Sequence, residues 1–349
     1  MENNQPKPAM NGFDGAGGGS FSSGTQIHQL QSPLPCGTDE LPSNLQRVLQ
    51  NGIRPYLWQR TLSFLTVREQ AVSVRGVSRL LRGCSDVYYM KIFWANPTTI
   101  HVPQDVDSLA RAMKLCSHLK KQEGYVEATT VVVALGSGVH EVIGSCTVLG
   151  LGTRQKMLPI PCDNLSIVGK GEGETIIDGG FAVEKGRKVS IAGLTMKDSI
   201  SFHSGGFAML IAFGVGTEMI LQNVTVEECQ YSGVYVRDGA KLDATGCQFH
   251  QNGGHGVYVR DSTTTARLTN CISHHNKFDG VVADDGAVVD LMGEGTSVHD
   301  NEGYGLSAEE SGTINVYQPC VLNDMSHGNK EQNIHMQRGG SVQQKDSKK

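Results

Sequence analysis

The chain has 349 residues, a formal net charge of −5, 38% hydrophobic residues and 19% charged residues, which excludes a protein that binds nucleic acid through bulk positive charge. No stretch of 18 consecutive apolar residues occurs, so we expect no membrane span, and the first residues lack the charged start and apolar core of a secretion signal. Nine cysteines without a CxxC pair fit free thiols in a reducing compartment, and we expect a cytoplasmic or nuclear protein.

The N-terminal quarter divides into two segments that differ in composition and hydrophobic pattern. Residues 1–40 are rich in Gly, Ser, Asn, Gln and Pro and show no hydrophobic periodicity, so we expect a disordered leader. Residues 41–97 have Leu, Val and Phe at helical spacing and few glycines. Pro42 and Pro55 can each stand at a helix start. This segment is therefore predicted to form two to four short helices.

A short strand and one amphipathic helix are expected next. "IHV" at residues 100–102 reads as a strand, and Asp107 or Ser108 can cap a helix near 107–121. Its apolar residues recur at helical spacing and fall on one stripe, namely Leu109, Ala112, Met113, Cys116 and Leu119. The helix can thus cover one end of a larger core.

Beyond residue 130 the chain becomes strand-like, punctuated by many of its 43 glycines, and repetitive. "GVYVRD" occurs twice, and the glycines that precede successive apolar runs are 23, 24 and 25 residues apart: Gly233, Gly256, Gly280 and Gly305. A repeat of about 24 residues built from short period-2 strands is typical of a solenoid, in which each rung buries its apolar side chains against the next. We therefore predict stacked rungs.

The same frame predicts columns of like residues. We take these four glycines as the reference positions of the repeat. Apolar residues follow each reference glycine, and asparagines lie four positions before three of them, at Asn252, Asn276 and Asn301. Each amide can bond the backbone and amide of the next rung. Cys247 and Cys271 share another position, where we expect small buried hydrophobes rather than a disulfide or a metal site.

Residues 98–340 resemble the right-handed parallel β-helix, pectin-lyase-like family. The resemblance rests on "TIHVPQDVDSLARAM", on "VVVALGSGVHEV" followed by "LSIVGKGEGETIIDGG", and on the rungs, which look like repeats of carbohydrate-binding and sugar-hydrolase proteins. It implies a mainly β fold with a small N-terminal helical segment, and residues 341–349 are expected to be a disordered tail. The fold by itself does not specify a function.

A second resemblance lies upstream, where "RPYLWQRTLSFLTVREQAVSVRGVSRLLRG" resembles an F-box. Leu81 stands where that family usually has Trp, and Glu69 where it often has Asp-Leu. The resemblance implies docking on the Skp-type adaptor of a cullin ubiquitin ligase, with the β-helix holding an unknown protein target. An unrelated helical cap is the alternative. The positions that would bind the adaptor are Pro55, Leu57, Leu62, Phe64, Leu65, Val77 and Leu81.

Catalytic motifs of sugar-acting β-helix enzymes are incomplete. The polygalacturonase-like order is Asn-Thr-Asp, an Asp pair, Gly-His-Gly and Arg-Ile-Lys. Here Gly254-His255-Gly256 precedes Asp284-Asp285, and the other two motifs are absent. Acid–base cleavage of a glycosidic bond needs two positioned groups, so no catalytic residue is assigned and a non-enzymatic role is favoured. Arg-Asp pairs stacked at one loop edge leave a lyase-like site as an alternative.

Two outward columns are candidate binding surfaces. One, six positions before each reference, consists of Glu227 and four histidines, among them His250, His274 and His299, which should form a ladder about 4.8 Å apart. Stacking of exposed imidazoles is the favoured interpretation, and a metal or acidic-ligand site is the alternative. We expect no resident metal or cofactor. The other column, formed by Tyr235, Arg237, Tyr258 and Arg260, offers residue types common at interfaces.

The favoured function is therefore a substrate-recognition subunit of a cullin-type ubiquitin ligase. The alternatives are a carbohydrate-binding or carbohydrate-active β-helix protein and a non-catalytic repeat scaffold. Neither a nucleic acid nor a membrane is expected as a partner.

Overall fold

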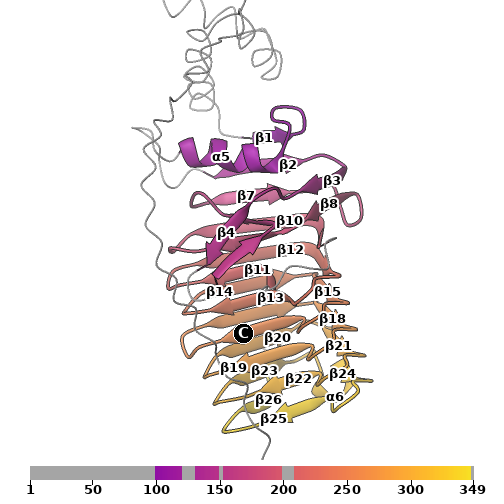
Figure 1. Ribbon diagram of the computed structural model, residues 1–349. Helices are drawn as coiled ribbons and strands as arrows, with labels where there is room; N and C mark the ends of the chain where they lie inside the picture. The colour runs from indigo at the N-terminus through magenta and orange to yellow at the C-terminus, as the bar shows by residue number, and fades with distance from the viewer. Residues whose placement is uncertain (1–98, 120–129, 149–151, 199–207, 347–349) are drawn as a thin grey trace, which may run out of the picture. The chain divides into compact units, whose positions relative to one another are not determined.

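The computed structural model describes residues 99–119, 130–148, 152–198 and 208–346. The predicted leader, the F-box-like segment and every proposed adaptor-binding residue lie outside these ranges. Among the described residues, no helix is long and apolar enough to cross a membrane. The described chain forms a parallel β-solenoid whose rungs follow one another from the magenta to the yellow end of Figure 1.

Three faces, each a row of parallel strands, make up the solenoid. The first face runs along the main path of the 16-stranded sheet. It contains β1 (Thr99–Val102), β2 (Val131–Leu135), β7 (Leu165–Val168), β10 (Lys188–Lys197), β12 (Glu218–Glu227), β14 (Lys241–Thr245), β17 (Thr265–Thr269), β20 (Val288–Met292), β23 (Thr313–Tyr317) and β26 (Ser341–Lys345).

The second face belongs to the same sheet and is joined to the first through the long strands β10 and β12. It contains the C-terminal halves of those two strands together with β3 (Gly138–Glu141), β8 (Thr175–Asp178), β15 (Gln248–His250), β18 (Ile272–His274), β21 (Ser297–His299) and β24 (Ser326–His327).

The third face is a separate eight-stranded sheet. It contains β6 (Met157–Pro159), β9 (Gly180–Val183), β11 (Ala208–Phe213), β13 (Ser232–Arg237), β16 (Val257–Arg260), β19 (Val281–Asp284), β22 (Leu306–Ala308) and β25 (Ile334–Met336). An antiparallel hairpin, β4 (Ser145–Val148) and β5 (Gly152–Gln155), and two helices, α5 (Leu109–Leu119) and α6 (Leu322–Met325), complete the described elements.

The corner between the first and second faces depends on left-handed backbone conformations. Gly193 has φ 61° in the middle of β10, and Asn223 has φ 51° in the middle of β12. Glycine adopts this region at little cost, and asparagine tolerates it better than most residues. The corner residues of later rungs, Asn270 and Gly293, continue this alternation. Each rung can thus turn sharply while its strands stay in register.

Inward side chains form columns that fill the solenoid. Val234, Val257, Val281 and Leu306 are paired strand to strand and are each 0% exposed, which confirms the repeat frame. Helix α5 closes the N-terminal end beside β1 and β2 (Figure 1), and Leu109, Ala112, Met113 and Cys116 on its apolar stripe join the core. Burial of aliphatic side chains between rungs supplies the main favourable free energy.

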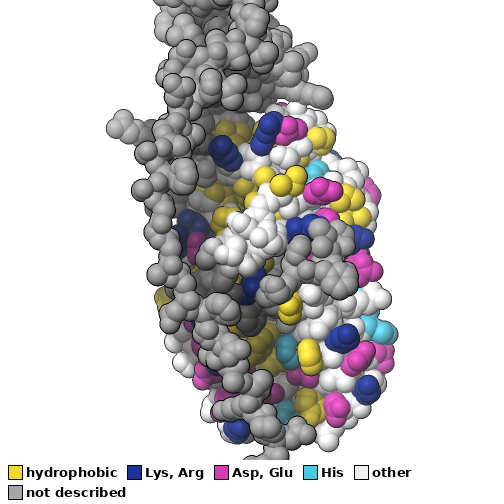
Figure 2. All heavy atoms as spheres, viewed as in Figure 1, with side chains coloured by type: hydrophobic (Ala, Val, Ile, Leu, Met, Phe, Trp, Pro, Cys, Tyr) yellow, Lys and Arg dark blue, Asp and Glu magenta, His cyan; other side chains and the backbone are white. Residues whose placement is uncertain are grey.

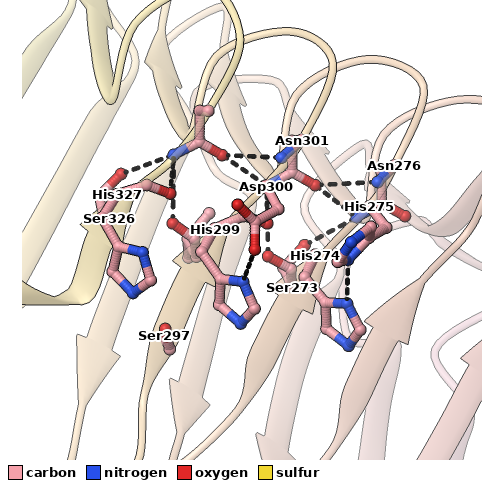
Figure 3. Close-up of polar contacts among 12 residues, drawn as sticks. Ser273, His274, His275, Asn276, Ser297, His299, Asp300, Asn301, Ser326 and His327 are labelled. Carbon is pink, nitrogen blue, oxygen red and sulfur yellow. Dashed lines mark hydrogen bonds and ion pairs between the residues drawn. The ribbon is translucent and has the colours of Figure 1, made fainter.

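The predicted asparagine column is present at the turn after the second face (Figure 3). Nδ2 of Asn252, Asn276 and Asn301 each donates to Oδ1 of the asparagine one rung further on, at 2.9 Å, and the last acceptor is Asn329. The same oxygens also accept backbone N–H groups of the preceding rung. Buried polar groups are therefore satisfied within the stack.

The two columnar cysteines are buried free thiols, as the sequence predicted. The expected disordered tail at 341–349 needs correction, because Ser341–Lys345 form strand β26 and pair with β23. The polar composition "QQKDSKK" concealed this strand, since a final rung needs few inward apolar residues. Val342, which pairs with Ile314, packs against the core.

Candidate ligand-binding site on the third face

At the N-terminal rungs, apolar side chains cover the outward side of the third face. Tyr235 is 4% exposed and belongs to a small cluster outside the core that includes Ile211 and Phe213, together with Cys146 and Val148 from the β4–β5 hairpin. Tyr258, one rung further, stacks on Tyr235 with ring centroids 5.1 Å apart and is half-buried. Tyr258 is thus the first partly exposed ring on this side, whereas Val282 and Ser307, which follow it in register on the next two rungs, are again buried at 3% and 0% exposed.

Aromatic rings line the edge where each rung enters the third face. His255 lies 5.3 Å from Tyr258 and 5.4 Å from Phe278, measured between ring centroids. One rung further, Tyr304 stacks on His335 at 4.1 Å. The Phe278 side chain is 56% exposed, and hydrophobic and histidine side chains lie next to one another on the half of the molecule that carries the C-terminal rungs (Figure 2). The edge thus presents several ring faces.

Carboxylates and an arginine lie beside these rings. The Tyr258 hydroxyl donates to Asp284 Oδ2 at 2.7 Å, and Arg260 Nε lies 3.7 Å from the same oxygen. Burial, and then the hydrogen bond to Asp284, raise the pKa of Tyr258 well above its usual value. Arg260 also reaches Asp285, with 3.8 Å between Nη2 and Oδ2. These polar groups fix the orientation of the tyrosine ring.

His255 and Asp279 form a pair with shifted protonation. The Asp279 backbone N–H donates to His255 Nδ1 at 3.2 Å, so the neutral imidazole has its proton on Nε2. Asp279 Oδ1 accepts the Tyr304 N–H at 2.7 Å, and its Oδ2 lies 3.5 Å from His255 Nδ1. Burial lowers the pKa of His255 to about 4 and raises the pKa of Asp279 to about 6. Between these values both groups are neutral.

We call this edge of the third face the aromatic–carboxylate patch and define it as Tyr258, His255, Phe278, Asp279, Asp284, Arg260, Tyr304 and His335. Of the Tyr-Arg column predicted from the sequence, Tyr258 and Arg260 belong to the patch, and His255 and Asp284 come from the incomplete Gly-His-Gly and Asp-Asp motifs. Tyr235 is covered, and Arg237 is held by Asp238 through Nε at 2.7 Å and Nη2 at 3.2 Å.

Phe278, Asp279 and Tyr304 were not identified from the sequence. A signal existed in the repeat frame, since His255, Asp279 and Tyr304 each stand directly before a reference glycine. The frame aligns these positions, but it does not say that they bring rings and carboxylates together at one edge.

His250, His274 and His299 lie on the second face and form a separate surface. The observed ladder runs through four rings, with centroid separations of 4.8 Å from His250 to His274 and 5.1 Å at each later step to His327. In Figure 3 the rings of His274, His299 and His327 lie parallel and point the same way. Burial, and then the neighbouring imidazoles, lower the pKa of His274 to about 4. His274 is thus held as a neutral imidazole between its stacked neighbours at neutral pH.

Comparison with known proteins addresses the fold. A model described as "Right handed beta helix region" matches residues 174–328, so this part of the chain is a right-handed parallel β-helix. No curated protein matches the sequence.

Three solved structures are similar to the chain at low identity. The A-module of mannuronan C-5 epimerase AlgE4 from Azotobacter vinelandii matches 63% of this chain and 89% of its own, with 15% identity and a TM-score of 0.22. ORF18 of Geobacillus virus E2 matches 76% and 63%, with 11% identity and a TM-score of 0.26. The A-module of epimerase AlgE6 from Azotobacter vinelandii matches 68% and 90%, with 14% identity and a TM-score of 0.19. These likenesses carry no argument about activity.

Proposed function

We propose that this protein binds an extended carbohydrate chain on the aromatic–carboxylate patch. The observation that carries the proposal is the exposed Phe278 ring next to His255, which also contacts Tyr258, whose hydroxyl is held by the Asp284 carboxylate. A saccharide has C–H faces that pack on aromatic rings and hydroxyls that hydrogen-bond to charged groups. The patch offers both kinds of contact on one face.

The solenoid geometry suits a long ligand. Equivalent positions recur once per rung, and neighbouring strands are about 4.8 Å apart. The two ring groups, His255 with Phe278 and Tyr304 with His335, come from successive rungs. A ligand that lies across the rungs would therefore meet a ring at more than one sugar unit. Because the sugar-hydrolase motifs are incomplete, we expect binding without cleavage.

The test is a glycan panel of neutral and acidic oligosaccharides, followed by calorimetric titration of the best ligand. Phe278→Ala and Tyr304→Ala should each weaken binding by about five- to thirtyfold, because each removes a stacking surface worth roughly 1–2 kcal/mol. Val215→Ala is the matched control, since Val215 is an exposed apolar residue in another loop. Equal affinity for all three variants, or no bound glycan, would contradict the proposal.

A second candidate function rests on the F-box-like sequence. In this proposal residues 41–97 dock on the Skp-type adaptor of a cullin ligase, in the cytoplasm or nucleus, and the β-helix holds a protein target. The support is the Leu-Ser-Phe-Leu core with Val-Ser-Arg about eleven residues later.

Co-purification of the full chain with the adaptor tests the second candidate. Complex formation should be lost in Phe64→Ala and also in the triple variant Leu62→Ala, Phe64→Ala and Leu65→Ala, while the melting temperature of the β-helix stays unchanged. Absence of a complex with the unaltered chain would leave residues 41–97 as a cap. The β-helix would then be a carbohydrate-binding domain or a plain repeat scaffold.

A further inference from the structure

The outward column of the second face changes from carboxylate to imidazole at one step. Glu227 pairs in register with His250, and His250 pairs with His274. His299 and His327 continue the column at one residue per rung. A carboxylate thus lies next to the first of four stacked imidazoles.

The second ring nitrogen of these histidines is held within its own rung. His250 Nδ1 lies 3.2 Å from Gln251 Oε1, and His299 Nδ1 lies 2.8 Å from Asp300 Oδ2. The amide and carboxylate oxygens are acceptors, so the tautomer that donates to them from Nδ1 leaves a lone pair on Nε2, the nitrogen that in His250 faces Glu227. Gln251 and Asp300 can fold back because both have φ 54°. Histidines that bind metals commonly donate the other ring N–H in this way.

The spacing between Glu227 and His250 fits two ligands of one ion. Glu227 Oε2 lies 3.5 Å from His250 Nε2. Two donor atoms bound at about 2.0–2.2 Å with a tetrahedral angle are roughly 3.4 Å apart. Both side chains are partly exposed, at 24% and 14%, so an ion can reach them from solvent.

From this geometry we propose that Glu227 and His250 form the primary pair of a site for a divalent transition-metal ion such as Zn²⁺, with His274 as the third ligand and water completing the coordination. As placed, no group of three or more His, Cys, Asp or Glu side chains in the described part of the chain is arranged to hold an ion. His274 is parallel to His250 at 4.8 Å and must tilt toward it. A displacement of one to two ångströms at the ring edge is enough for this closure.

The residues around the proposed ligands determine the expected metal affinity. Lys197 pairs in register with Glu227 on the opposite side from His250, and its positive charge opposes an incoming cation. His274 Nδ1 and His275 Nδ1 are 2.7 Å apart, so one of the two rings donates to the other, and metal binding selects the form in which His274 Nε2 is free. We therefore expect moderate affinity. This site lies on the second face and does not depend on carbohydrate binding by the third.

The experiment is calorimetric titration of the full chain with ZnCl₂ at neutral pH, with Co²⁺ absorption as a second readout. We expect one site per chain, and at least a tenfold loss of affinity in both Glu227→Gln and His250→Gln. His327→Gln is the matched control, because it removes a ladder imidazole far from the carboxylate and should leave affinity unchanged. Melting curves without metal show whether each variant folds. If His250→Gln does not fold, the Zn²⁺ affinity of Glu227→Gln alone tests the proposal.

Two results would overturn the proposal. One is the absence of saturable Zn²⁺ binding by the unaltered chain. The other is binding that survives in Glu227→Gln and His250→Gln but is lost in His327→Gln, which would place the ion elsewhere on the ladder.

Discussion

At the scale of single residues, the free energy of folding depends on whether a buried polar group has a hydrogen-bond partner and whether it is charged. Asp279 accepts a backbone N–H from Tyr304, yet burial raises the pKa of its carboxyl from 3.8 to about 6. The folded state therefore favours the protonated acid. That contribution to stability is complete below pH 3.8, where the unfolded chain is protonated too, and it is lost as the pH rises through about 6.

Replacing Asp279 by Asn should make the protein more stable at neutral pH. The amide keeps the acceptor for Tyr304 and has no charge to desolvate, so the gain at pH 7.5 should be at most about 3 kcal/mol. The gain should disappear near pH 4. Urea unfolding of both proteins between pH 4 and 7.5 measures this difference.

The titration of the buried His255 does not affect the stability difference between Asp279→Asn and the unaltered chain. Its lowered pKa destabilises the fold as the pH falls from 6.5 toward 4, but it does so in both proteins. A difference between Asp279→Asn and the unaltered chain that stays constant over this pH range would show that Asp279 is not protonated in the folded state.

At the scale of elements, the turn before the third face is fixed by close contact between rungs. A Cβ atom on Gly256 would lie 2.1 Å from Ser273 Oγ, 2.6 Å from the Gly280 carbonyl oxygen and 2.9 Å from Asn276 Nδ2. These atoms belong to the next rung and to the asparagine column, so they cannot move independently. The repeated glycine is therefore a packing requirement of the turn.

Gly256→Ala should lower the free energy of unfolding by about 2–3 kcal/mol, because the methyl group forces neighbouring rungs apart. Gly295→Ala is the control, since its nearest contact would be Asn270 Oδ1 at 3.3 Å, and it should cost less than about 1 kcal/mol. Urea unfolding measures both. A similar cost for the two variants would mean that rung contact does not determine the glycine column.

At the scale of the whole molecule, stability is a sum over rungs that contact only their neighbours. Leu291 in β20 is 0% exposed and has a rung on each side, from β17 and β23. Val342 in β26 is partly exposed, and among the described strands β26 pairs with β23 alone. Interior and terminal rungs should therefore respond differently to loss of an apolar side chain.

Leu291→Ala should destabilise the β-helix by about 2–5 kcal/mol, as expected for a large-to-small change at a fully buried site. Val342→Ala should cost about 1 kcal/mol or less. Thermal or urea unfolding measures the two changes. Equal costs would imply that the C-terminal rung is packed as tightly as the interior.

The sequence determined the solenoid because a repeat leaves a periodic record. Intervals of 23 to 25 residues, an apolar column and an asparagine column specify which residues stack, and the register of β13, β16, β19 and β22 follows that frame. The histidine ladder followed for the same reason, since strand alternation places His250, His274 and His299 outward. The last strand was missed because β26 has a single partly buried valine in a polar context.

Only the tertiary structure decided which outward residues meet. The hairpin residues Cys146 and Val148 join the cluster that covers Tyr235, although nothing in the repeat links them to it. Phe278 and Asp279 reach His255 from the next rung, and the 3.5 Å approach of Glu227 to His250 depends on side-chain orientation. A periodic sequence specifies position along the stack, whereas a binding site depends on distances between side chains, and those are set when the rungs pack.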